Sequence, residues 1–260
     1  MLTALFPIGD DNSDRNSVPL VTWALIAANF AVFLLLQLPS PHDAFTYGYS
    51  VVPAKLLRGH DITTPLYFPG VGTIPEAAGP HPIYLTILWS MFMHAGWAHI
   101  LGNMLYLWIF GDNVEDAMGP VKYLCFYLIC GTVACLSQVG AALVTGGLNL
   151  YLPSLGASGA IAGVLGAYLV LYPTRRVRVL LGWWGIVQVP AFVVIGLWIM
   201  LQLLSGFGSL DPAAASAGGV AYFAHIGGAL CGMILVWFFR DPSRARRRTA
   251  SWRPPGRYPY

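Results

Sequence analysis

Two residues in this chain, a serine and a histidine, lie in apolar sequence and carry side chains that acyl transfer uses. Ser158 and His225 each have a glycine within two residues along the chain. A hydroxyl in an apolar helix is commonplace, because it can bond to the backbone of its own helix. An ionisable histidine at membrane depth is costly and is by default a functional hypothesis. Together the two residues predict a serine nucleophile that a histidine base activates.

Small residues recur at helical spacing beside both side chains. Around Ser158 they are Gly156, Gly159, Gly163 and Gly166, and after His225 they are Gly228 and Gly232. Small residues spaced in this way let membrane helices pack closely. Such packing would bring His225 against Ser158, and the alternative is that the glycines only pack helices.

A second polar cluster precedes this pair in the chain. His99 and Asn103 are four residues apart and so share one helix face. Both can donate a hydrogen bond, which is what the oxyanion of an acyl-transfer site needs. A structural bond between helices is the alternative. His94 is predicted to brace the preceding loop.

Metal-dependent and aspartyl chemistry are not predicted. The chain has no His-Glu-x-x-His motif, and Asn is a poor zinc ligand. No predicted span contains the two carboxyls that aspartyl proteolysis requires. We therefore expect a Ser–His dyad with neither metal nor cofactor.

The elements that position these residues are predicted to be membrane helices. Of 260 residues, 57% are hydrophobic and only 10% are charged, against roughly 25% charged in soluble domains. Hydropathy and Gly/Pro punctuation predict an all-α, polytopic protein of six spans around a recessed site. The predicted spans are Val18–Leu38, Trp97–Phe110, Pro120–Val144, Ala157–Tyr172, Val179–Ser205 and Val220–Phe239.

The distribution of basic residues predicts the orientation and the domain plan. All Lys and Arg except Lys55 and Arg58 fall on one side if both termini are cytoplasmic. Residues 1–17 then form a cytoplasmic segment without signal-peptide character, and 240–260 a basic cytoplasmic tail. Residues 18–239 form one membrane domain with a long first loop, 39–96. That loop and the 205–219 loop are expected on the opposite side, where Ser158 begins its helix.

The order and spacing of these motifs resemble the rhomboid family of intramembrane serine proteases. The resemblance rests on His94-x4-His99-x3-Asn103, on Gly156-Ala157-Ser158-Gly159, and on His225 followed by Gly228-xxx-Gly232. It implies that Ser158 is the nucleophile and His225 the general base and acid. The oxyanion hole would be formed by His99, Asn103 and the Ser158 backbone N–H. The segment from Gly111 to Gly119 resembles the family's turn after the second span.

Two departures from the family pattern are visible. Ala162 stands one turn after the nucleophile, where many rhomboids carry an aromatic residue that stacks on the catalytic histidine. We therefore expect His225 to lack an aromatic wall. The Trp-Arg pair often seen in the first loop is absent at Leu85-Thr86.

The predicted function is cleavage of transmembrane helices of other proteins within a lipid bilayer, the bacterial inner membrane being the expected location. No nucleic-acid partner is expected. A proteolytically inactive relative that binds transmembrane helices is one alternative, and the intact Ser158 and His225 argue against it. A transporter is another, but no repeat and no intramembrane carboxylate are found.

Overall fold

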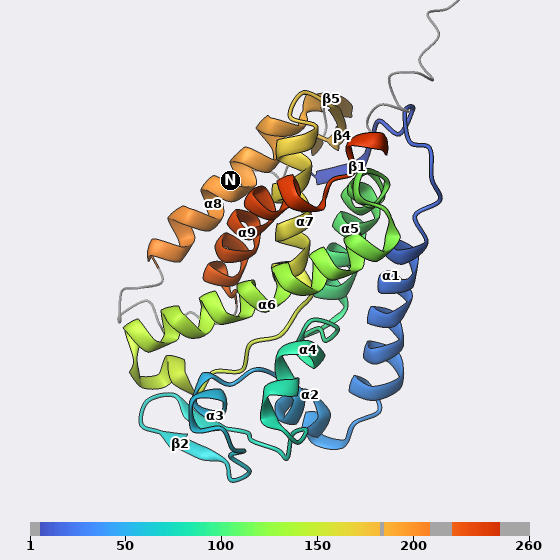
Figure 1. The fold of residues 1–260 in the computed structure, drawn as a ribbon. Coiled ribbons are helices and arrows are strands. Elements are labelled where there is room, and N and C mark those ends of the chain that lie inside the picture. Colours follow the sequence, from blue (N-terminus) through green and yellow to red (C-terminus); the bar gives the residue numbers. More distant parts are fainter. Residues whose placement is uncertain (1–5, 183–184, 209–219, 245–260) are drawn as a thin grey trace, which may run out of the picture.

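The protein is a bundle of long helices with short elements at both ends (Figure 1). The computed structural model describes residues 6–182, 185–208 and 220–244. Part of the predicted 205–219 loop and most of the basic tail lie outside these residues. The long helices are α1 (Leu20–Val32), α5 (Trp97–Met118), α6 (Pro120–Thr145), α7 (Ser158–Leu171), α8 (Ala191–Gly208) and α9 (Tyr222–Phe239).

The predicted polytopic helical architecture is confirmed. Among the described residues, four helical stretches are long and apolar enough to cross a membrane: Leu20–Gln37, Pro120–Thr145, Ala191–Gly208 and Tyr222–Phe239. The first of them continues α1 through a π-helical turn, η1 (Phe33–Gln37). Helix α7 is apolar but has only 14 residues. It packs in the middle of the bundle against α6 and α9.

Two predicted boundaries are wrong, for different reasons. Helix α5 does not end at Phe110 but runs through Gly111 to Met118, because the acidic side chains in this stretch find partners elsewhere in the fold. The fifth span was predicted from Val179, but two strands, β4 (Arg176–Leu180) and β5 (Ile186–Pro190), precede α8. Val177 and Val179 are buried, while Arg176 and Arg178, which alternate with them, are exposed. This is the two-residue period of a strand.

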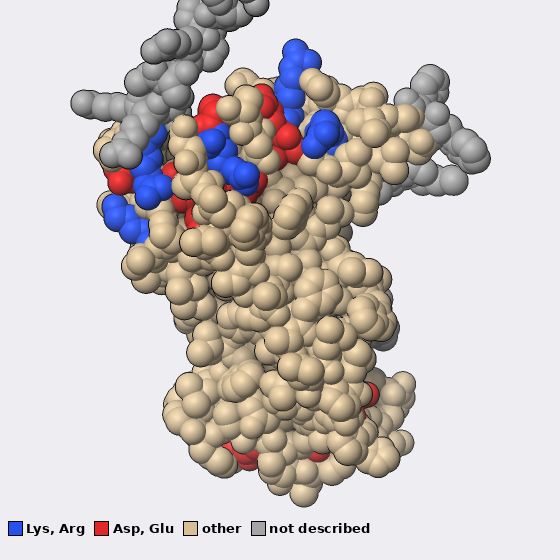
Figure 2. All heavy atoms as spheres, turned by 90° about the vertical axis from the view of Figure 1, so that its right-hand side faces the viewer, with Lys and Arg blue, Asp and Glu red and all other residues tan. Residues whose placement is uncertain are grey.

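Strands β4 and β5 form one sheet with β1 (Phe6–Asp10), in the order β1-β4-β5 with both pairings antiparallel. The sheet lies at the end of the bundle where α5 meets α6 (Figure 1). On the face shown in Figure 2, Lys, Arg, Asp and Glu side chains gather at this end, and a broad band below them carries none. We call the end of the bundle that holds the β1-β4-β5 sheet the basic end.

The first loop forms the other end of the bundle. It folds into short elements: η2 (Pro41–Asp43), α2 (Ala44–Tyr49), α3 (Pro53–Arg58), β2 (Leu66–Phe68), β3 (Gly72–Ile74), η3 (Ile83–Leu85) and α4 (Thr86–Ser90). Buried Lys55 holds them together, with its Nζ 2.9 Å from Asp61 and 2.8 Å from Glu76. Burial raises the pKa of Glu76. Val51 pairs with Ser154, which ties this loop to the segment just before α7.

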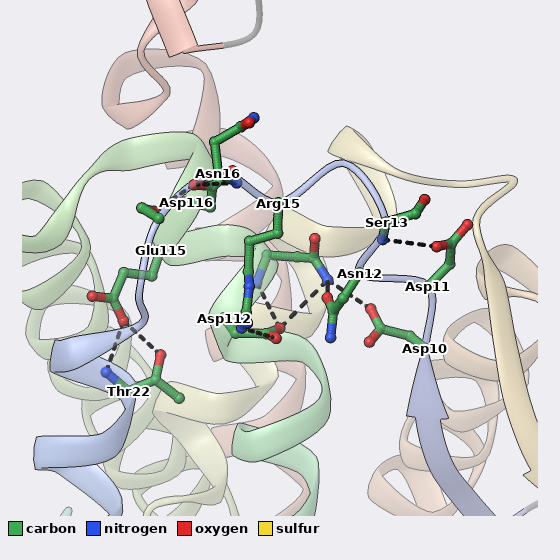
Figure 3. A network of polar contacts seen from close by, with 12 residues as sticks. Asp10, Asp11, Asn12, Ser13, Arg15, Asn16, Thr22, Asp112, Glu115 and Asp116 are labelled. Carbon is green, nitrogen blue, oxygen red and sulfur yellow. Dashed lines mark hydrogen bonds and ion pairs between the residues drawn. The ribbon is translucent and has the colours of Figure 1, made fainter. Parts of the chain in front are cut away.

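A polar network fixes the N-terminal segment at the basic end (Figure 3). Glu115 on α5 accepts hydrogen bonds from the backbone N–H groups of Val21 and Thr22, at 3.0 and 2.8 Å. It thereby caps the first turn of α1, whose N–H groups lack partners within the helix. Arg15 pairs with Asp112 at 2.7 Å. The stretch from Gly111 to Met118, which resembled a turn, is therefore the last part of helix α5. Contacts with the N-terminal part of the chain stabilise it.

Candidate active site

Ser158 is the first residue of α7 and is half-buried. At 1.5 Å per residue, the 14 residues of α7 extend about 21 Å, less than the roughly 30 Å hydrocarbon core. The chain enters the helix through Gly156, whose φ of +133° is unfavourable for other residues. The Gly156 N–H donates to the Ser90 carbonyl at 2.8 Å. These features place a serine hydroxyl at a recessed helix N-terminus.

The predicted glycine seam joins α7 to α9. A Cβ on Gly228 would collide with the carbonyl oxygen of Gly159, and one on Gly232 with that of Gly163. The two backbones therefore touch along the length of α7, as the small-residue pattern predicts. Gly156 is not part of this contact, since its Cα faces the His99 ring.

His225 lies one turn before Gly228 and is brought to Ser158 by this close packing. Its Nε2 lies 2.7 Å from the Ser158 Oγ, a hydrogen-bonding distance. His225 is buried, with only 8% of its surface exposed. A serine hydroxyl that donates to a buried imidazole is the geometry of a nucleophile with its base.

The His99 ring approaches this site from α5, next to Gly156. The Ala95 N–H donates to His99 Nδ1 at 3.3 Å, so the proton of a neutral ring is on Nε2. That Nε2 lies next to Gly156, beside the Ser158 Oγ. The Asn103 Nδ2 is buried and has no hydrogen-bond partner among the described residues. His99 Nε2 is thus a donor beside Ser158, and Asn103 Nδ2, on the same helix α5, is a buried donor that is unsatisfied among the described residues.

His94 lies behind His99 rather than at the serine. It is 1% exposed, and its ring meets the His99 ring edge to face at 5.0 Å. Gln37, from the π-helical turn η1, holds the His94 backbone, accepting from its N–H at 2.8 Å and donating to its carbonyl at 3.0 Å. The bracing role of His94 stays a prediction, since both of its ring nitrogens lack a hydrogen-bond partner among the described residues.

Two residues of α8 that the sequence analysis missed also contact His225. Gln202 Oε1 lies 2.9 Å from the His225 Nδ1. The Trp198 indole lies 5.6 Å from the imidazole, centre to centre. The expectation that His225 lacks an aromatic wall is therefore wrong. The only sequence signal was that Gln202 is the one glutamine of the apolar helix α8 and follows a tryptophan by four residues.

A cavity of about 30 Å³ adjoins Ser158. Small residues dominate its wall, among them Gly131, Ala134, Gly159 and Ala160. No group of three or more metal-ligating side chains occurs in the part of the chain that the structure describes.

Comparison with known proteins points in one direction. A family model described as the Rhomboid domain matches residues 82–242. "Rhomboid protein 1, mitochondrial" of Saccharomyces cerevisiae is 28% identical over 239 residues, covering 90% of this chain and 58% of that protein. "Presenilin-associated rhomboid-like protein, mitochondrial" of Homo sapiens is 27% identical, covering 84% and 50%. "Rhomboid-like protein 11, chloroplastic" of Arabidopsis thaliana is 31% identical, covering 60% and 52%.

The chain thus spans about half the length of the curated relatives it matches. These relatives are named as mitochondrial or chloroplastic proteins. The prediction of a bacterial inner membrane, with termini in the cytoplasm, is contradicted by these names, whereas a multi-pass membrane protein remains supported.

Proposed function

The chain belongs to the rhomboid family, and on this premise we propose that it is an intramembrane serine endopeptidase that acts through Ser158 and His225. Family membership supports intramembrane serine protease activity in general. The assignment of individual residues rests on one observation, the 2.7 Å contact between Ser158 Oγ and His225 Nε2. On the evidence of the relatives' names, its membrane is that of an organelle.

The proposed reaction follows from the arrangement of donors and acceptors. His225 Nε2 takes the proton of Ser158 Oγ as the oxygen attacks the scissile carbonyl carbon, and later returns it to the leaving amine. The developing oxyanion accepts hydrogen bonds from Asn103 Nδ2, His99 Nε2 and the Ser158 N–H. Water then hydrolyses the acyl-enzyme by the same sequence of proton transfers. Asn103 Nδ2 supports this role, because it is buried without a partner among the residues that the structure describes, and such a donor is costly.

The proposed substrates are transmembrane segments of other proteins. A helix hides its carbonyls in i→i−4 hydrogen bonds, so the segment must unwind locally to reach Ser158. Helix-weakening Gly or Pro near the cut should help. The narrow cavity walled by Gly131, Ala134 and Ala160 favours a small side chain before the scissile bond.

A fluorophosphonate probe tests the nucleophile directly. Wild-type protein in detergent should be labelled at Ser158, and Ser158→Ala and His225→Ala should lose both the label and cleavage of a transmembrane substrate. Ser205→Ala, which removes an exposed serine of α8, is the matched control. Because the dyad acts as a unit, the double variant should be no slower than either single variant. Labelling of folded Ser158→Ala would refute the assignment, and absence of labelling in the wild type would favour an inactive helix-binding protein.

A further inference from the structure

Both ring nitrogens of His225 have partners, and they come from different helices. Nε2 faces Ser158 of α7 at 2.7 Å, and Nδ1 faces the Gln202 Oε1 of α8 at 2.9 Å. A neutral imidazole donates through one nitrogen and accepts through the other. The partner of Nδ1 therefore decides whether Nε2 can accept the serine proton.

An amide oxygen is only an acceptor, so it selects the productive tautomer. With Gln202 Oε1 opposite it, Nδ1 carries the hydrogen and donates. Nε2 is then left with its lone pair toward the Ser158 hydroxyl, which is the state a general base needs. In the opposite tautomer Nε2 would donate to Ser158 and could not take its proton.

The same face of α8 also restricts the orientation of the His225 ring. Trp198 lies four residues before Gln202, and such residues share a helix face. Its indole lies 5.6 Å from the imidazole with the ring planes tilted by 39°. His225 is thus fixed by a hydrogen bond at Nδ1 and by an aromatic contact on its face.

We infer that Gln202 is a positioning residue for His225, with Trp198 as its aromatic support, so that α8 supplies a neutral third member to the Ser–His pair. This inference rests on the proposed function. A carboxylate would perform the same orientation, but at membrane depth it is expensive. A carboxamide sets the tautomer without a buried charge, as Asn does in papain-like Cys-His-Asn sites.

The inference is tested with Gln202→Leu and Gln202→Glu, with Leu204→Ala on the exposed side of α8 as the control. Gln202→Leu should lower kcat on the order of 10²-fold, the scale of a misplaced catalytic group, and leave KM unchanged. Gln202→Glu restores an acceptor and should recover most of kcat. Its carboxylate favours the imidazolium, so the acid limb of the kcat/KM profile should move to higher pH. Leu204→Ala should match the wild type.

Nitrogen-15 NMR of histidine-labelled protein separates tautomer selection from a merely structural role. His225 should carry its hydrogen on Nδ1 in the wild type and should lose this preference in Gln202→Leu. Wild-type kcat in Gln202→Leu, or an unchanged tautomer there, would overturn the inference. If Gln202→Leu does not fold, an acid limb that is unshifted in Gln202→Glu would overturn the inference instead. Activity surviving in Ser158→Ala would instead refute the proposed function, whatever the Gln202 variants show.

Discussion

At the scale of single residues, the site combines satisfied and unsatisfied polar groups. Ser158 and His225 satisfy each other, whereas the buried Asn103 Nδ2 lacks a partner among the described residues. A buried donor without a partner destabilises the resting protein, and it makes a hydrogen bond when an oxyanion forms. The interaction is therefore stronger in the transition state than in the ground state, which is the condition for acceleration.

Asn103→Ala should accordingly lower kcat on the order of 10²–10³-fold, the usual loss for one oxyanion donor. Its unfolding temperature should not fall, since Nδ2 has no hydrogen bond to lose within the described part of the chain. Turnover of a transmembrane substrate and thermal unfolding, measured in one detergent, check both statements. Normal turnover with lowered stability would show a structural bridge instead.

Ala162 gives a second residue-scale prediction. It is fully buried, and Trp198 already supplies the aromatic contact to His225. Ala162→Tyr should therefore overfill its position, which commonly costs about 1–3 kcal/mol, and should not raise kcat. Thermal unfolding and kcat are compared with Ala27→Tyr, an exposed position on α1. A more stable and faster Ala162→Tyr would show an unfilled space beside His225.

These residues differ in how visible they are in the sequence. Ser158, His225, His99 and Asn103 stand in recognisable spacings, and histidine at membrane depth is conspicuous. Gln202 could not be assigned from sequence, because an isolated amide in an apolar helix has many possible partners. Only the placement of α8 beside α9 gives it one.

At the scale of elements, the contact between α7 and α9 fixes the distance from Ser158 to His225. The glycines leave no room between the two backbones, so the seam acts as a rigid spacer. Small changes in helix separation should then have large effects on chemistry.

Gly228→Val should push α9 away from Gly159 and lower kcat about 10²-fold or more, because a displacement of about 1 Å has that effect. Gly228→Ala should show a smaller loss. Gly196→Val on α8 is the matched control, since a Cβ there meets open space. Wild-type rates in folded Gly228→Val would contradict the spacer role.

Helix boundaries were harder to predict than helix packing. The end of α5 contains Gly111 and several acidic residues, which by local propensity indicate a turn. It stays helical because Glu115 and Asp112 bind Thr22 and Arg15, about 95 residues away. A local window cannot contain such partners. The β4–β5 hairpin was not predicted, because its apolar content is high enough for a membrane span. Only the alternation of buried and exposed residues in β4 indicates a strand.

At the scale of the whole molecule, the polar network at the basic end joins the N-terminal segment to α5 (Figure 3), and Tyr168 extends it to α7. Asp10 accepts hydrogen bonds from Tyr168 Oη at 2.6 Å and from Asn113 Nδ2 at 2.8 Å. Burial, with nearby Asp112, raises the pKa of Asp10 from about 3.8 to about 6. The composition predicted a membrane protein. This network could not be predicted, because its members lie more than 100 residues apart in the sequence and meet only in the folded protein.

The raised pKa of Asp10 has a definite sign for stability. The folded protein holds the Asp10 proton more tightly than the unfolded chain, so stability from this group is present below pH 4 and is lost as pH rises to about 6. At roughly 1.4 kcal/mol per pKa unit the loss is about 3 kcal/mol. The unfolding temperature of wild type relative to Asp10→Asn should therefore fall between pH 4 and pH 7.

Asp11→Asn provides the opposite control. Hydrogen bonds from Ser13 lower the pKa of Asp11, so its contribution is present at neutral pH and is lost as pH falls. A difference between wild type and Asp10→Asn that does not change with pH would contradict the buried, proton-binding role of Asp10.

The basic-end network also has a consequence in time. Arg175 binds Asp14, 161 residues earlier in the chain. At roughly 5–20 residues per second of translation, the aspartate waits about 8 to 32 s before its arginine is made. The contact between Asp14 and Arg175 therefore forms only after α1, α5, α6 and α7 have been synthesised, so the polar network at the basic end is completed late.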